Sequence, residues 1–89
     1  MSIHTSHPDI IKRLKRAEGH LKTIISMMEA GRACLEVSQQ LQAVESAVAN
    51  AKRALIHDHI DHCLDHVMQS DGKEAADAMR EFKEITKYL

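Results

Sequence analysis

A segment rich in histidine and cysteine lies between residues 57 and 66, where four histidines and one cysteine occur in ten positions. On an α-helix, side chains four positions apart share one face, so His59 pairs with Cys63 and His62 pairs with His66. An imidazole and a thiolate one helical turn apart can chelate a single soft or borderline metal ion. The segment therefore predicts a transition-metal site on a helix, although two ligands alone do not make a selective site.

The other cysteine, Cys34, lies far from this segment along the chain. Both cysteines fall on one predicted helix, whose rise separates them by about 43 Å, so Cys34 cannot join the site within its own chain. In an antiparallel dimer, the start of one long helix lies beside the end of its partner. Cys34 of a second subunit can then complete a Cys-His-Cys site with His59 and Cys63 across the interface.

Other interpretations of these residues stay open. A solvated position on the helix surface suits His57, and also His62 and His66. His59 and Cys63 can instead form a half-buried polar pair in a dimer core. A catalytic cysteine-histidine dyad has less support, because the sequence shows no glycine-rich loop, no oxyanion-hole turn and no third orienting group. We therefore expect neither an enzyme nor a pocket for a small organic substrate.

Composition is typical of a soluble helical protein. The 89 residues are 44% hydrophobic and 28% charged, with only three Gly and one Pro. The N-terminus has no apolar signal segment, and no stretch approaches the ~18 apolar residues needed to span a membrane. We expect a cytoplasmic protein with no membrane partner, in which the reducing environment favours cysteines that bind metal or act in redox chemistry over a disulfide.

Apolar residues recur at alternating steps of four and three, which predicts helices with a heptad seam. The first seam comprises Ile10, Leu14, Ala17, Leu21, Ile24 and Met28, and the second comprises Val37, Leu41, Val44, Val48, Ala51 and Leu55. The predicted helices cover residues 8–30, 34–67 and 73–88, after a flexible arm at residues 1–7. We expect an all-α fold in a single domain of residues 1–89.

The long middle helix cannot be covered by its own chain, because apolar surface at Ile56, Ile60 and Leu64 is left over. Two chains can bury this surface by pairing as an antiparallel four-helix core with the third helices outside. A chain of this size buries only ~60% of its unfolded surface, which also favours association. The sequence therefore predicts a homodimer.

The net charge of −1 conceals an asymmetry along the chain. Residues 1–57 carry eight Lys and Arg against five Asp and Glu, a net charge of +3. Residues 58–89 carry four against eight, a net charge of −4. Taken alone, the basic half fits a solvated amphipathic face as well as a surface that contacts phosphates.

Four segments of the chain together resemble one known family. They are Arg13–Leu21 (RLKRAEGHL), Cys34, Gln39–Val44 (QQLQAV) and His59–Cys63 (HIDHC). These segments and the spacing of the cysteines and histidine are similar to the CsoR/RcnR family of bacterial metal-sensing repressors, over essentially the whole chain. The resemblance implies a homotetramer, a dimer of dimers, that binds operator DNA when metal-free and releases it when metal binds.

The resemblance also implies roles for individual residues. Cys34 is supplied by one subunit, and His59 and Cys63 are supplied by the other. The expected DNA-contacting residues are Arg13 and Arg53, with Lys12, Lys15, Arg16 and Lys52 nearby. Repeated in a tetramer, these charges form a phosphate-contacting face, and DNA shape contributes to recognition because the chain has no helix-turn-helix.

Two branches of the family differ in the metal they sense. A Cys-His-Cys set is that of the copper branch, and soft thiolates suit Cu(I). Nickel and cobalt sensors recruit N-terminal histidines or the terminal amine, and this chain carries His4 and His7, although the family's fourth ligand aligns with Ser2. The N-terminal histidines favour Ni(II)/Co(II) over Cu(I), with His4, His7 and His62 as candidate additional ligands.

The copper branch couples its histidine ligand to a tyrosine and a glutamate outside the ligand set. In this chain Ala33 precedes Cys34, and the position of the glutamate falls near Met79, two residues before Glu81. This departure also favours the nickel/cobalt branch. The family's formaldehyde sensors begin with Pro where this chain has Ser2, and its persulfide sensors lack the histidine at position 59.

A protein of another class, a cytoplasmic metal-buffering bundle with no DNA role, would use the same ligands. The basic first helix argues against it, because a storage protein has no use for Arg13, Arg16 and Arg53 on one face. We therefore expect a metal-responsive repressor whose release from DNA allows expression of metal efflux or resistance genes.

Overall fold

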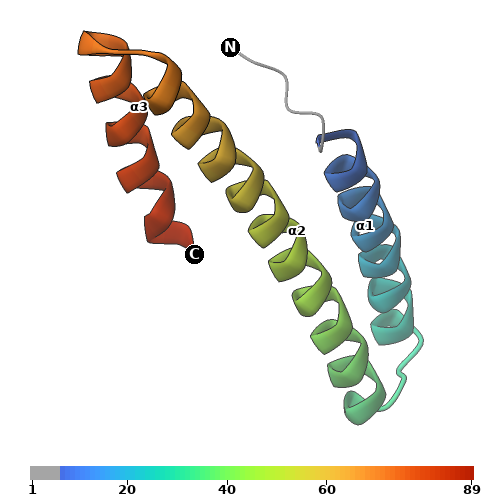
Figure 1. Cartoon of the computed structure of the whole chain (residues 1–89). Coiled ribbons are helices and arrows are strands. Elements are labelled where there is room, and N and C mark those ends of the chain that lie inside the picture. Colours follow the sequence, from blue (N-terminus) through green and yellow to red (C-terminus); the bar gives the residue numbers. More distant parts are fainter. Residues whose placement is uncertain (1–6) are drawn as a thin grey trace. The chain divides into compact units, whose positions relative to one another are not determined.

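The computed structural model describes residues 7–89, so His4 and the arm before His7 lie outside the described residues. Three helices follow one another, α1 (His7–Glu29), α2 (Cys34–Gln69) and α3 (Gly72–Ile85), and a 3-10 helix (Thr86–Tyr88) extends the last (Figure 1). The prediction of an all-α chain with a long second helix is confirmed. No helix within residues 7–89 is long and apolar enough to cross a membrane.

Gly31 ends α1 as the sequence predicts. Its φ of 74° lies in the left-handed region that favours glycine. The Gly31 amide donates to the Met28 carbonyl at 3.1 Å, and the Arg32 amide donates to the Met27 carbonyl at 3.0 Å. This is the paired hydrogen-bond pattern of a Schellman cap, which satisfies the last carbonyls of the helix and turns the chain.

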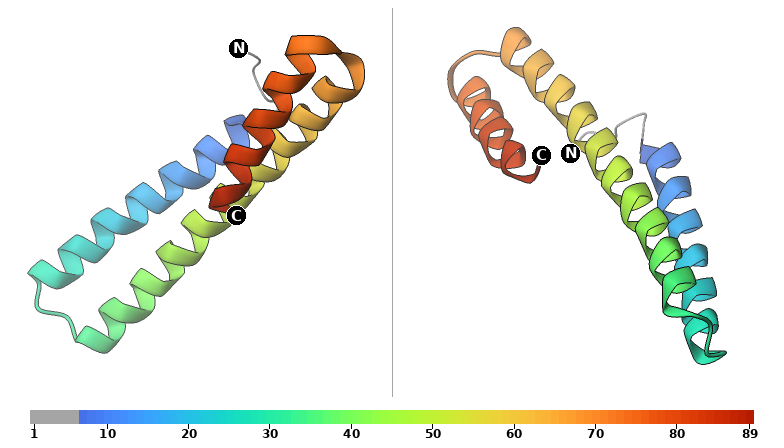
Figure 2. Two further views of the ribbon diagram at one scale, coloured as in Figure 1. Left: turned by 90° about the vertical axis from the view of Figure 1, so that its left-hand side faces the viewer. Right: turned by 90° about the horizontal axis from the view of Figure 1, so that it is seen from below.

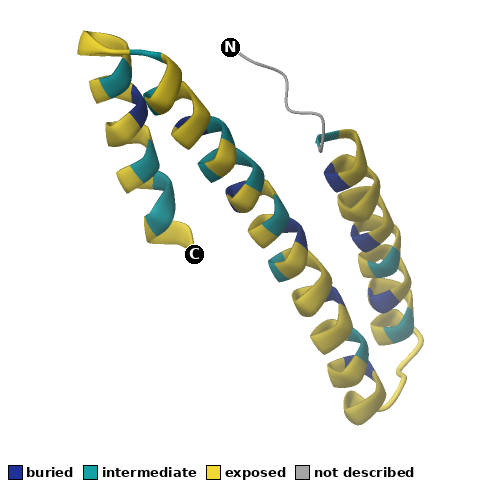
Figure 3. Cartoon of the chain, in the orientation of Figure 1, coloured by how far each residue is buried: buried dark blue, intermediate teal, exposed yellow. Residues whose placement is uncertain are grey.

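Residues 8–52 form one compact unit, a hairpin of α1 and the first part of α2 (Figure 2). Its core is a cluster of Ala17, Ile24, Val37 and Val44, with Met27 packed against it. Successive buried positions on each helix lie seven residues apart, so each helix buries one row of side chains (Figure 3).

The predicted seam is therefore only half buried within the chain. The alternate seam residues are all exposed: Leu14 43%, Leu21 42%, Leu41 44%, Val48 43%, Leu55 38% and Met28 62%. Two helices packed side by side bury one row of each seam, and the alternate row, which lies about 40–60° further around the helix, stays at the edge of the contact. The exposed row leaves apolar surface of the kind that associating helices bury.

Arg53–Leu89, together with His7, form the second compact unit. In it, α3 runs back beside the last part of α2 after the turn at Ser70–Gly72 (Figure 2). Gly72 has a φ of 60°, which favours glycine at this turn. Cys63 and Ala78 are buried, at 3% and 6% exposed. This unit positions the predicted metal ligands of α2 against side chains of α3.

Candidate metal centre

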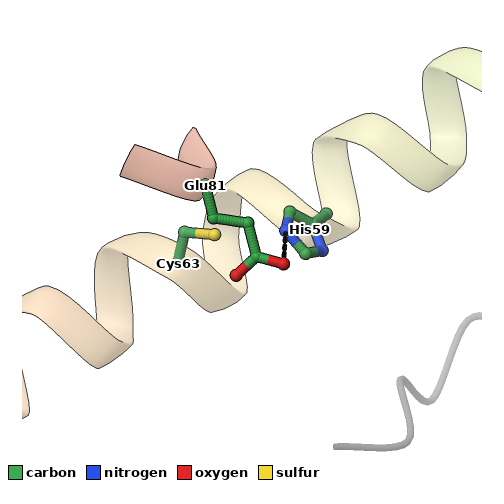
Figure 4. Close-up of side chains that lie close together, drawn as sticks. All are labelled: His59, Cys63 and Glu81. Carbon is green, nitrogen blue, oxygen red and sulfur yellow. Dashed lines mark ion pairs between the residues drawn. The ribbon is translucent and has the colours of Figure 1, made fainter. Parts of the chain in front are cut away.

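Three side chains converge between α2 and α3. His59 and Cys63 lie one turn apart on α2, and Glu81 reaches them from α3 (Figure 4). One ligand atom from each, a ring nitrogen, the thiol sulfur and a carboxylate oxygen, lies within 4.8 Å of the others. His59 Nε2 and Glu81 Oε1 are 3.4 Å apart and form an ion pair when the imidazole is protonated.

The three side chains differ in their access to water. Cys63 is 3% exposed, whereas the side chains of His59 and Glu81 are 20% and 63% exposed. Burial raises the pKa of the Cys63 thiol, and the nearby negative charge of Glu81 raises it further. Cys63 is thus held in the protonated form when no cation is bound, and a metal ion must displace that proton.

This donor set fits a transition metal ion. A thiolate and an imidazole are ligands for soft and borderline metals, and a carboxylate is a harder donor. Glu81 can act as an oxygen ligand, or it can accept a hydrogen bond from His59 and orient the ring. The second arrangement is the usual partnership of a metal-bound histidine with a carboxylate.

The other predicted ligands among the described residues are not part of this cluster. Cys34 is the first residue of α2 and is exposed, and it belongs to the compact unit of residues 8–52. His7 is half-buried at the start of α1 and is grouped with residues 53–89. His62 is half-buried on α2, where its ring stacks on that of His66. Their roles as ligands remain predictions.

Glu81 is the residue of the cluster that the sequence did not place. The glutamate of the copper branch was expected near Met79, whose side chain is 37% exposed. Glu81 lies three residues after the buried Ala78, which places it at the edge of the packed face of α3, in agreement with its largely exposed side chain. That spacing was the available signal, and it identifies the carboxylate that lies beside His59.

The predicted DNA-contacting residues of α1 lie on an exposed basic surface. Arg13 and Arg16, with His20 and Asn50, line a hollow of about 390 Å³ in the unit of residues 8–52. His20 Nε2 is 2.6 Å from Gln40 Oε1, which links α1 to α2. Lys12, Lys15, Lys52 and Arg53 are exposed as well. Such a surface suits contacts with phosphates, and the DNA-binding role remains a prediction.

Comparison with known proteins gives consistent matches over nearly the whole chain. Residues 6–88 match the model of a family described as metal-sensitive transcriptional repressors. The copper-sensing transcriptional repressor CsoR of Bacillus subtilis (strain 168) is 38% identical over 80 residues, covering 88% of this chain and 79% of that protein. CsoR of Mycobacterium ulcerans (strain Agy99) is 36% identical over 80 residues, covering 89% and 68%.

A solved structure has the same fold. The nickel-responsive transcriptional regulator InrS superimposes with a TM-score of 0.82 at 28% sequence identity, covering 100% of this chain and 99% of that one. The chain is therefore similar both to copper-sensing repressors and to a nickel-responsive regulator.

Proposed function

The chain belongs to the family of metal-sensitive transcriptional repressors, the CsoR/RcnR family, and we propose that it represses metal efflux or resistance genes until metal binds at His59 and Cys63. Metal-sensing repression is the function of the family. The expectation that the chain is not an enzyme is confirmed by its relatives, which are repressors. The observation that carries the proposed site is the convergence of His59, Cys63 and Glu81.

Cys34 of a second subunit supplies the third strong ligand in this proposal. The chain's own cluster holds one thiol, and Cys34 is exposed at the start of α2, so it is accessible to another chain. The exposed row of Leu14, Leu21, Leu41 and Val48 supports an assembly in which helices of several chains pack together. We propose the homodimer and the homotetramer on this basis.

His59 and Cys63 would hold the metal ion in this proposal, and Glu81, whose Oε1 is 3.4 Å from His59 Nε2, would accept a hydrogen bond from the ring and fix its orientation. Cys63 and Cys34 lose their protons when the ion is captured, so binding releases protons and tightens contact between subunits. Because the two binding equilibria are linked, bound metal lowers the affinity for DNA and bound DNA lowers the affinity for metal by the same factor, typically about 5- to 150-fold.

Operator DNA is the partner of the metal-free form, bound in the cytoplasm by the basic residues of α1 and by Lys52 and Arg53. The hollow beside Arg13 and Arg16 supports this, because it presents two guanidinium groups on an exposed helix face. A metal-buffering protein with the same ligands would not bind operator DNA.

Ni(II)/Co(II) is the first candidate for the inducing metal. The nickel-responsive structure shares the whole fold with this chain. His7, and His4 beyond the described residues, add imidazoles near the start of the chain, and His7 is grouped with the unit that contains His59 and Cys63. Additional nitrogen ligands raise the coordination number toward the square-planar or octahedral geometries of these ions.

Cu(I) is the second candidate, favoured by the copper-sensing relatives at 36% and 38% identity. Glu81 also supplies beside His59 the carboxylate that the copper branch places there. A Cys-His-Cys set without further ligands suits a soft ion of low coordination number.

A gel-shift titration with DNA from upstream of the gene tests the function and separates the metals. We expect the metal-free protein to bind DNA with strong salt dependence and to be released by one of Ni(II), Co(II) or Cu(I). Cys34→Ala should still bind DNA but should not respond to metal, whereas His57→Gln, on the exposed surface of α2, should behave like the unaltered chain. Release of Cys34→Ala by metal would rule out the site shared between subunits.

Replacing His4 and His7 by glutamine then decides between the two metals. If Ni(II)/Co(II) is the inducer, this double variant should lose part of its response. If Cu(I) releases the unaltered chain and the variant equally, and Ni(II) and Co(II) release neither, copper is the inducing metal.

A further inference from the structure

His62 and His66 form a ring pair on α2 outside the cluster of His59, Cys63 and Glu81. Their ring centroids are 5.9 Å apart and the ring planes are inclined by 27°, so the rings lie one above the other along the helix. His62 is half-buried, and His66 is exposed near the end of α2. One ring is therefore partly held in place while the other is free to turn toward a ligand.

We propose that His62 and His66 form a second metal-binding pair on the surface, which takes a borderline divalent ion such as Ni(II), Cu(II) or Zn(II). Histidines four positions apart on a helix bring their ring nitrogens to one side, which is how two such residues chelate a zinc ion. Imidazole suits these divalent ions without a thiolate. Water completes the coordination at an exposed pair of this kind.

Acidic residues around the pair support cation binding. Asp58 lies one turn before His62 on the same face and is half-buried, and Asp65 neighbours His66 in sequence. Carboxylates near metal-bound histidines commonly accept their second ring proton and orient the ring. Residues 58–89 carry a net charge of −4, which raises the local concentration of cations.

The pair is chemically distinct from the site of His59 and Cys63. The group whose ligand atoms lie within 4.8 Å of one another, among the residues the structure describes, consists of His59, Cys63 and Glu81. That group contains a thiol, which favours softer ions, whereas the ring pair offers nitrogen donors only. One chain can therefore hold two ions, bound with different strengths.

The test removes the first site and titrates the second with Ni(II). The full-length triple variant Cys34→Ser/His59→Gln/Cys63→Ser, made in a chain in which the proposed Ni(II) ligands His4 and His7 are also changed to Gln, should bind one equivalent of Ni(II) per chain in calorimetry. Adding either His62→Gln or His66→Gln should weaken that binding by about 10-fold or more, because a monodentate imidazole remains. Adding His57→Gln, which leaves the pair intact, should not change it.

If the triple variant does not fold, His62→Gln and His66→Gln can be compared in the otherwise unaltered chain. There His66→Gln should lower the Ni(II) stoichiometry by one equivalent and leave metal-dependent release of DNA unchanged. Loss of DNA release in His66→Gln would instead place this histidine in the sensing site. Unchanged Ni(II) binding in both His62→Gln and His66→Gln would show that the rings only stack, and would overturn the proposal.

Discussion

Replacing Glu81 by alanine tests whether the carboxylate beside His59 tunes the metal centre. Carboxylates that accept the second proton of a metal-bound histidine typically contribute 10- to 100-fold to metal affinity. Glu81 Oε1 is 3.4 Å from His59 Nε2 and the Glu81 side chain is 63% exposed, so solvent weakens the contact. We therefore expect a loss of metal affinity of about 10-fold, or about 1.4 kcal/mol, at the lower end of that range.

The size of this loss should depend on pH, because Glu81 also acts on Cys63. Burial is the larger cause of the raised pKa of the Cys63 thiol, and the charge of Glu81 is the second. Removing that charge lowers the pKa of Cys63. At a pH below this pKa, protons then compete less strongly with the metal ion for the thiolate. The affinity loss should thus be greatest at high pH, where the thiol is ionised in both proteins, and smaller at low pH.

A competition titration against a chromophoric chelator at several pH values measures both effects. Glu84→Ala is the matched control, because Glu84 is 65% exposed on the same helix and pairs with Lys87 at 3.1 Å, away from the cluster. Equal affinities for Glu81→Ala and Glu84→Ala at every pH would refute the role of the carboxylate. A loss that grows as the pH falls would refute the sign of its effect on Cys63.

Three further predictions concern the thiol, the core and the assembly. In the metal-free protein, the buried Cys63 should react with iodoacetamide more slowly than the exposed Cys34, and Glu81→Gln should speed the reaction of Cys63, as measured by mass spectrometry. Ile24→Val should lower the free energy of unfolding in urea by about 0.5–1.5 kcal/mol, because Ile24 is 2% exposed. Leu41→Asp, on the exposed apolar row, should shift the protein to smaller species in light scattering while circular dichroism keeps its helical signal; an unchanged mass would contradict the proposed use of that row.

Features that depend on one helix alone were predictable from the sequence. The pairing of His59 with Cys63 follows from the helical repeat, and the end of α1 follows from the glycine at position 31. Glu81 was harder to place, because its position depends on the turn before α3 and on how that helix lies beside α2. A shift of one residue in that turn would rotate a different side chain toward His59.

The half-buried seam shows a second reason why sequence patterns fall short. A heptad repeat indicates which residues prefer to leave water, but it does not say whether their own chain covers them. Val37 and Val44 are buried within the chain, whereas Leu41 between them is 44% exposed. The role of Cys34 depends on the same question, because its proposed partners belong to another chain.

The two cysteines lie in opposite environments, and this contrast connects the proposed metal site to the assembly. Cys63 is buried beside a carboxylate that disfavours its thiolate, whereas Cys34 is exposed at the start of α2. A metal ion bound by both must compensate for deprotonating Cys63 and for fixing Cys34 against another chain. That cost is smallest in an arrangement of subunits that already brings Cys34 close to Cys63. At the proposed site shared between subunits, metal binding would therefore select among subunit arrangements, and an ion would alter the proposed DNA-binding surface without contacting it.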